Sequence, residues 1–381
     1  MIKRDSINSL LIIVFFGIQI LFLFIKSEFN TYSNYSLIIE FLFLIAILII
    51  NYKEVLKSKR ELLFIFFCLT CSFISIVVTN SGFGGLLNIF NFIVGFYIFS
   101  KIKINDRSKF IFVVIFMILN FLMIYYAKDA WNLHILKKSI LNPNTIALLI
   151  FLSFSILNSL LFGSKNKLIK LLLLVLFCIN LYYVYICESR TIFYAMLIYA
   201  IITYVPLLRT FFSKSAKKVL ILACILGVMI PFVYVYLYKN GIYFNVPFST
   251  KTLYSGREAI WNVMISNLNN SNLGYLFGLG TNNYTIIGII SNYHNWFLGI
   301  VYAFGSINCI IYFSYVLFNV FKIDRYYIKN IIICLFIIGM FETAGLWAIT
   351  HFYIFFILLI GINLDKEVKK NGKNNSVYSN I

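Results

Sequence analysis

Long apolar runs follow one another from end to end of this chain, and short polar stretches separate them. A helix of about 20 apolar residues is long enough to cross the hydrocarbon core of a bilayer. The alternation therefore predicts an all-α polytopic bundle of about twelve spans in one membrane domain, residues 1–363. The polar, Asn-rich tail at 364–381 is expected to be cytoplasmic and disordered. The expected spans lie near residues 9–25, 35–52, 62–79, 83–100, 110–127, 145–162, 168–187, 191–207, 219–238, 295–318, 326–341 and 346–363.

Composition agrees with this pattern, because 61% of the residues are hydrophobic and only 12% are charged. Together with a mean hydropathy of +0.91, these values exclude an ordinary soluble domain. The net charge of +19 does not indicate nucleic-acid binding, since 24 of the 32 basic residues fall in alternate loops between the expected spans. Such a bias is typical of cytoplasmic loops. Both termini are therefore expected in the cytoplasm, with anionic lipids as partners of the basic loops.

One polar segment, residues 239–293, is too long for a passive connector, and we expect it to be a functional outer loop. Within it, Ser255 followed by Glu258 has the spacing of a capping box and predicts a helix that starts at Gly256. Apolar residues then recur at helical spacing, at Trp261, Met264, Ile265 and Leu268. This helix is too short to span, so it is expected to lie along the membrane interface.

Arg190 is held in a very tight outer turn, the ESR of residues 188–190 between two apolar runs. An arginine at the bilayer centre costs about 2.5–3.5 kcal/mol on insertion scales, so Arg190 must face the interface or the bundle interior. In one interpretation Glu188 and Arg190 merely neutralise each other at the turn. The stiff hairpin favours the other, a fixed contact between Arg190 and an anion.

Other polar residues mark the outer ends of spans. His294 and Asn295 stand where the long outer segment re-enters the membrane, and Trp296 beside them is expected in the aromatic belt. Asn142 and Asn144 flank a proline at another outer entrance. Each pair also has a structural interpretation that suffices alone, as an interfacial hydrogen-bonding group or as the cap of a proline-started helix.

Several kinds of site have no motif in this sequence. It contains no P-loop, no Gly-rich nucleotide fingerprint and no carboxylate motif like those of metal-dependent transferases. Glu342 lies in a short outer turn, but no spacing assigns it a role.

The outer motifs follow one another in a familiar order. They are Asn142-Pro143-Asn144, Ser189-Arg190, Ser255-Gly256-Arg257 with Trp261, the pair Gly278 and Gly280, and His294-Asn295. This order resembles the O-antigen ligase/polymerase family of bacterial envelope glycosyltransferases, which contains the Wzy-type polymerases and the lipopolysaccharide O-antigen ligases. The resemblance is firm over about residues 188–305, and the expected topology agrees with it elsewhere.

The resemblance implies a GT-C-like membrane enzyme whose donor is a sugar chain on undecaprenyl diphosphate, at the outer face of the bacterial cytoplasmic membrane. It implies no cofactor and no metal. Arg190 and Arg257 would stabilise the diphosphate, while His294 would orient or deprotonate the acceptor hydroxyl, or bond a phosphate oxygen. Further substrate contacts are expected from Asn142, Asn144, Ser255, Glu258, Trp261 and Asn295.

Three functions remain open at this point. The lean, idiosyncratic composition favours a polymerase that joins repeat units into O-antigen or capsular polysaccharide, with a flippase and a chain-length regulator of the same pathway as partners. A ligase that passes the finished chain to lipid A-core shares the same motifs. A lipid-linked-oligosaccharide flippase or other transporter would be expected to show an internal repeat and charged residues in mid-membrane, and the sequence shows neither.

Overall fold

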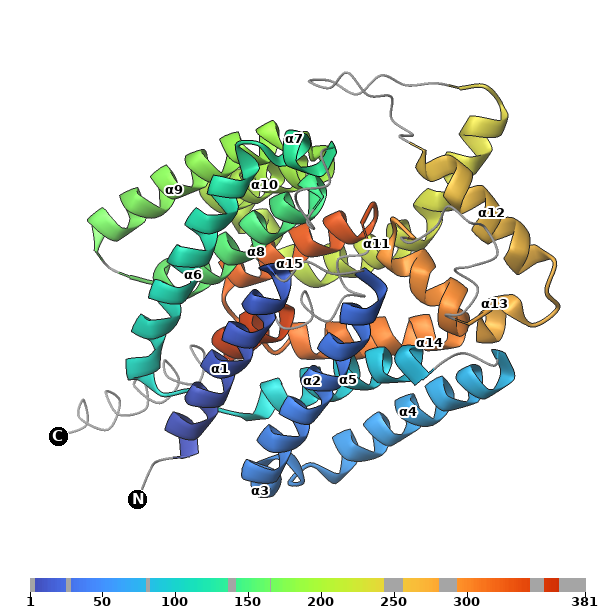
Figure 1. The fold of residues 1–381 in the computed structure, drawn as a ribbon, viewed down its shortest axis with the longest axis horizontal. Helices are drawn as coiled ribbons and strands as arrows, with labels where there is room; N and C mark the ends of the chain where they lie inside the picture. The colour runs from blue at the N-terminus through green and yellow to red at the C-terminus, as the bar shows by residue number, and fades with distance from the viewer. Residues whose placement is uncertain are drawn as a thin grey trace.

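The structure is a computed structural model that describes residues 4–24, 29–79, 83–135, 142–164, 166–242, 256–280, 293–342 and 353–362. Every regular element within these ranges is a helix, which confirms the predicted all-α class. The tail at 364–381 and most of the outer segment at 239–293 lie outside them. Figure 1 shows the helices as one bundle, with the short helices α12 and α13 beside α11 and α14.

The longer helices coincide with the apolar runs, and shorter or more polar helices lie between them. They are α1 (Arg4–Phe24), α2 (Phe29–Ile50), α3 (Tyr52–Val55), α4 (Lys59–Thr79), α5 (Phe83–Lys101), α6 (Asp106–Ala127), α7 (Ala130–Ile135), α8 (Pro143–Leu161), α9 (Lys167–Ile186), α10 (Arg190–Tyr204), α11 (Pro206–Lys239), α12 (Arg257–Asn269), α13 (Gly274–Phe277), α14 (Trp296–Val320), α15 (Tyr326–Gly339) and an apolar helix at Tyr353–Ile362. Six of them, α4, α6, α8, α9, α11 and α14, are long and apolar enough to cross a membrane.

The boundary between α10 and α11 differs from the prediction. A basic loop was expected between spans at 191–207 and 219–238, but α11 runs unbroken for 34 residues through that stretch. The chain breaks earlier, where Val205 is extended and Pro206 starts the next helix. A residue before proline avoids the helical conformation, and proline fits the first helical position well. The polar stretch SKSAKK contains no helix breaker, so it continues the helix.

Pro231 inside α11 has a consequence for the rest of the bundle. Proline has no N–H group, so the carbonyl four residues earlier, that of Gly227, loses its partner within the helix. The side chain of Asn295 donates a hydrogen bond of 3.0 Å to this Gly227 oxygen. Gly227 also lets α14 approach closely, because a Cβ there would collide with the ring of Phe297. Gly227 and Pro231 thus create the place on α11 where the start of α14 docks.

A second break, at Gly305, divides α14 and creates the docking place for α13. Gly305 has φ 84° and ψ 168°, a conformation essentially restricted to glycine. The carbonyls of Tyr302 and Ala303, before the break, accept hydrogen bonds of 2.7 Å and 3.1 Å from Leu279 N and Gly280 N. The Gly-x-Gly element, residues 278–280, therefore binds backbone carbonyls at the point where the helix is broken.

The start of α4, the end of α5 and the end of α14 meet in a cluster that contains two lysines. Lys101 Nζ at the end of α5 and Lys322 Nζ just after α14 lie 2.5 Å and 3.2 Å from the two carboxylate oxygens of Glu61 on α4. We call these three residues the Glu61 cluster. Because α14 begins beside His294 and ends beside Lys322, the Glu61 cluster and His294 lie at opposite ends of one helix.

Gly305→Ala is predicted to destabilise the fold by at least roughly 1–3 kcal/mol, the cost of a non-glycine residue in this backbone region. The new Cβ would also collide with the carbonyl of Leu276, which lies just before the Gly-x-Gly element. The measurement is the thermal unfolding midpoint in detergent. Gly17→Ala is the matched control, since nothing lies within 4 Å of a Cβ at this position in α1. It should be neutral or slightly stabilising. Equal midpoints for the two variants would contradict the role of the break.

Candidate functional site

Three ionisable side chains from distant parts of the sequence meet where α12, α14 and α15 come together. Arg257 Nη2 lies 2.6 Å from Glu342 Oε1, and His294 Nδ1 lies 3.5 Å from Glu342 Oε2. The Arg257 and Glu342 side chains are only 12% and 10% exposed, whereas that of His294 is 28% exposed. We call these three residues the Glu342 cluster. One carboxylate thus lies between a guanidinium group and an imidazole ring.

Arg190 adds a second guanidinium to this region. It is the first residue of α10 and is half-buried, and its positive charge interacts electrostatically with that of Arg257. Arg257 is likewise the first residue of its helix, α12. The N-terminus of a helix carries about half a positive charge, so an arginine is unfavourable there. Two arginines and two helix N-termini together form a positive region suited to an anion.

The start of α12 corrects the predicted capping box. Gly256 has φ 82° and occupies the N-cap position, so it does not belong to the helix, and no side chain caps this end. Helix α12 therefore begins at Arg257, and Glu258 is its second residue. A capping box requires the glutamate at the third position of the helix. Ser255 lies outside the described residues. Glu258 is half-buried, and its Oε2 has no hydrogen-bond partner within the described part of the chain.

The apolar face of α12 packs against the protein. Trp261, Met264 and Leu268 are all at most 1% exposed. The Trp261 ring lies 5.2 Å from that of Tyr234 on α11, and its Nε1 donates a hydrogen bond of 2.9 Å to the Tyr293 carbonyl. Trp261 has no exposed surface in this structure, and its expected substrate contact stays a prediction. Its side chain joins the helix that carries Arg257 to the residue before His294.

Asn295 also has a structural role, and its expected substrate contact likewise stays a prediction. Its side chain is fully buried and accepts a hydrogen bond of 2.6 Å from Leu298 N, which caps α14. Its amide donates to Gly227 O and, at 2.7 Å, to Met340 O at the end of α15. Asn295 therefore links the backbone next to His294 to the end of α15, two residues before Glu342.

The backbone of His294 is strained between these fixed neighbours. Its φ is 50°, in the left-handed region that a residue with a side chain seldom adopts. Trp296, expected in the aromatic belt, is instead 1% exposed and packs in the core against Phe313 and Phe336. The strained conformation persists because the surrounding contacts determine it, a situation found most often at functional sites.

The environment of Glu342 keeps its carboxylate ionised. Burial alone would raise its pKa, but the charge of Arg257 and the hydrogen bond and charge of His294 outweigh burial and lower the pKa below its usual value of 4.5. The charge on Glu342 partly neutralises Arg257. Arg190 contributes a second positive charge close to that of Arg257.

The Asn-Pro-Asn motif does not join the Glu342 cluster. Asn142 caps α8, accepting hydrogen bonds of 2.7 Å from Thr145 N and 3.0 Å from Thr145 Oγ1. Asn144 is half-buried in the first turn of α8. Within the described residues no hydrogen bond or ion pair links Asn142 or Asn144 to the cluster, so the helix-cap interpretation describes what Asn142 does.

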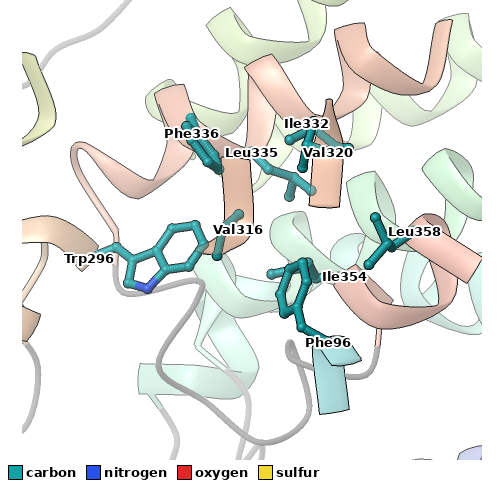
Figure 2. A pocket seen from close by; sticks show the side chains of 9 residues that line it. All are labelled: Phe96, Trp296, Val316, Val320, Ile332, Leu335, Phe336, Ile354 and Leu358. Carbon is teal, nitrogen blue, oxygen red and sulfur yellow. The ribbon is translucent and has the colours of Figure 1, made fainter. Parts of the chain in front are cut away.

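Two other candidate sites are not supported. The described ranges contain no group of three or more His, Cys, Asp and Glu side chains that could hold a metal ion. A cavity of about 10 Å³ lies between α5, α14, α15 and the helix at 353–362, with Trp296 at its edge (Figure 2). It is lined by aromatic and aliphatic side chains and has room for one water molecule at most. We regard it as a packing defect of the core.

Glu342 is the residue of this site that the sequence pattern did not assign. The sequence feature that could have identified Glu342 is its position, because it is a carboxylate at the outer end of an apolar run in a chain with few acidic residues. Its partner Arg257 is 85 residues away, and spacing gave no way to pair them. No protein-family model, curated protein or solved structure matches this chain, so its structure alone defines the site.

The lowered pKa of Glu342 predicts a pH-dependent contribution to stability. The contribution is complete above the ordinary pKa of 4.5 and is lost as the pH falls through the lower pKa of the folded state. Glu342→Gln should therefore lower the unfolding midpoint at neutral pH, and its deficit relative to the unsubstituted protein should shrink as the solution is acidified. Unfolding midpoints of both proteins, measured from neutral pH to about pH 3, test this. A deficit that stays constant with pH would mean that the ionised form of Glu342 does not stabilise the fold.

Proposed function

We propose that this chain is a membrane glycosyltransferase that polymerises oligosaccharide repeat units carried on undecaprenyl diphosphate, at the outer face of the bacterial cytoplasmic membrane. The observation that supports the proposal is the meeting of Arg190, Arg257 and His294 in one positive region. These are the three residues to which the sequence resemblance assigned the chemistry, and they come from three separate segments of the chain. Their product would be O-antigen or capsular polysaccharide.

The charge of this region suits the leaving group. When the bond from the anomeric carbon to the diphosphate breaks, negative charge develops on the phosphate oxygens. Fixed guanidinium groups can stabilise that charge through paired, charge-assisted hydrogen bonds. A guanidinium group carries five N–H donors, and the contact of Arg257 Nη2 with Glu342 leaves others for a phosphate. The half-buried Arg190 would contact the same diphosphate.

The bundle has the dimensions that the proposal requires. Helix α14 has 25 residues in two segments separated by the break at Gly305, and it is one of the six helices that are long and apolar enough to cross a membrane. It leads from His294 at one end to the Glu61 cluster at the other. We assign the Glu61 end, which lies among the basic loops, to the cytoplasm and the Glu342 end to the outer face. We further propose twelve spans in a GT-C-like arrangement.

Single-cysteine labelling tests this orientation. Asn270, exposed after α12, is predicted to react with an impermeant maleimide from outside the cell. Lys167, exposed at the start of α9, should react only after the membrane is opened. The seven native cysteines are first replaced, so that each label reports one position. The reverse pattern would place the Glu342 cluster in the cytoplasm and would exclude an outer-face reaction.

Arg190→Ala and Arg257→Ala are each predicted to lower turnover by roughly 10²–10³-fold, as loss of an oxyanion-hole donor does. Lysine should rescue poorly at either position, because one ammonium cannot reproduce the two-pronged guanidinium contact. The assay is the ladder of chain lengths formed from lipid-linked repeat units by purified protein, at matched protein levels.

Lys128→Ala provides the control for lost positive charge. Lys128 is exposed in the turn after α6, which the expected topology places on the same outer side, and its removal should leave the ladder unchanged. Ladders like those of the unsubstituted protein from either arginine variant would overturn the mechanism. Transfer of preformed chains to lipid A-core without any ladder would assign the ligase reaction instead.

A further inference from the structure

The two oxygens of the Glu342 carboxylate have different partners. Oε1 lies 2.6 Å from Arg257 Nη2, and Oε2 faces His294 Nδ1 at 3.5 Å. Arginine can only donate hydrogen bonds, and an ionised carboxylate can only accept them. The lowered pKa of Glu342 keeps the carboxylate in that accepting form. The nitrogen of His294 that faces it is therefore best satisfied when it carries the hydrogen.

We propose that Glu342 is a positioning residue that makes His294 a general base, an inference that rests on the proposed glycosyl transfer. Glu342 holds the imidazole hydrogen at Nδ1, which leaves the other ring nitrogen, Nε2, unprotonated. Arg257 fixes the orientation of the carboxylate and hence of the ring. This decides between the roles open to His294, because a ring held in this way accepts a proton from the acceptor hydroxyl and does not donate a hydrogen bond from Nε2 to a phosphate.

The architecture around His294 supports a fixed ring with one accessible side. The Trp261 indole holds the carbonyl of Tyr293, and Asn295 is locked to Gly227 and Met340. The side chain of His294 nevertheless remains 28% exposed, the most of the three members of the cluster. The contact of 3.5 Å is long for a hydrogen bond, and such contacts at catalytic sites commonly shorten when substrate binds.

The proposed step balances in atoms and charge. Nε2 of His294 takes the proton of the acceptor hydroxyl, and the electron pair of that oxygen forms the new bond to the anomeric carbon. The bond from this carbon to the diphosphate oxygen breaks, and its electrons leave with the undecaprenyl diphosphate. The imidazolium, stabilised by the adjacent Glu342 carboxylate, then returns its proton to water.

Glu342→Gln is a sharp test, because it forces the opposite arrangement. The amide of glutamine has one acceptor and one donor side, and Arg257 can only donate to the acceptor side. The NH₂ group must then face Nδ1 of His294, which becomes an acceptor and leaves the hydrogen on Nε2. The variant keeps nearly the same shape but holds the histidine in the tautomer that cannot act as a base.

Nitrogen-15 NMR of histidine-labelled protein reads the tautomer without any assay of activity. The chain has three histidines, and His294→Ala identifies the relevant signal. At a pH well above the ordinary histidine pKa of about 6.5, the native protein should show hydrogen on Nδ1. Glu342→Gln should move it to Nε2, and Glu342→Asp should restore Nδ1 at least in part. Hydrogen on Nε2 in the native protein, or no change on substitution, would overturn the inference even if the chain polymerises sugars.

Kinetics then test the consequence for the reaction. Glu342→Gln should lower kcat by roughly 10²–10⁴-fold, the usual contribution of a general base, and should change KM little. The double variant His294→Ala with Glu342→Gln should be no slower than His294→Ala alone, because Glu342 acts through the histidine. Multiplying losses would show that Glu342 acts independently. If the tautomer shifts as expected but the native protein transfers no sugar, the pairing of Glu342 with His294 would be supported and the proposed function contradicted.

Discussion

The side-chain amide of Asn295 binds two backbone carbonyls that the helices themselves cannot satisfy, and the rest of the site depends on this contact. The Gly227 oxygen is available because Pro231 has no N–H group, and the Met340 oxygen is available because α15 ends there. A buried carbonyl without a partner is costly, so each of the two favours the docking of Asn295. One residue thereby joins α11, α14 and α15. His294 precedes it in the chain, and Glu342 lies two residues beyond Met340.

Electrostatics then determine what this rigid junction can do. Burial opposes the charge on Glu342, but Arg257 and His294 outweigh burial, and the carboxylate stays ionised between them. Arg190 adds a second positive charge near that of Arg257. The region therefore combines an attraction for anions with one carboxylate placed to orient an imidazole. Those are the two requirements of a transfer reaction with an anionic leaving group and a hydroxyl acceptor.

Much of the architecture could be predicted from the sequence, since apolar runs determine where helices form. Each expected span overlaps a helix in the described part of the chain, and six of these helices are long and apolar enough to cross a membrane. The apolar face of α12 was recognised by its spacing. The boundary at Val205 was missed because polarity was taken as the end of a helix, whereas the proline decides it.

The roles of individual side chains were less predictable. Asn295 and Trp261 were expected to contact substrate because they belong to the motifs of the resemblance, and the structure shows in addition that both are fully buried. Glu342 had no assigned role, since its pairing with Arg257 exists only in the folded chain. Sequence order locates polar residues at the ends of spans, but it does not reveal which of them face one another.

The position of a bound lipid diphosphate is the most direct measure of the central claim, that the region around Glu342 binds the leaving group. Cryo-electron microscopy of the protein with undecaprenyl diphosphate would locate the two phosphates. The account predicts phosphate density within hydrogen-bonding distance of the guanidinium groups of both Arg190 and Arg257, with His294 beside it. One alternative basic site in the described chain is the Glu61 cluster, at the other end of α14. Phosphate density there, or at any place away from both arginines, would contradict the account.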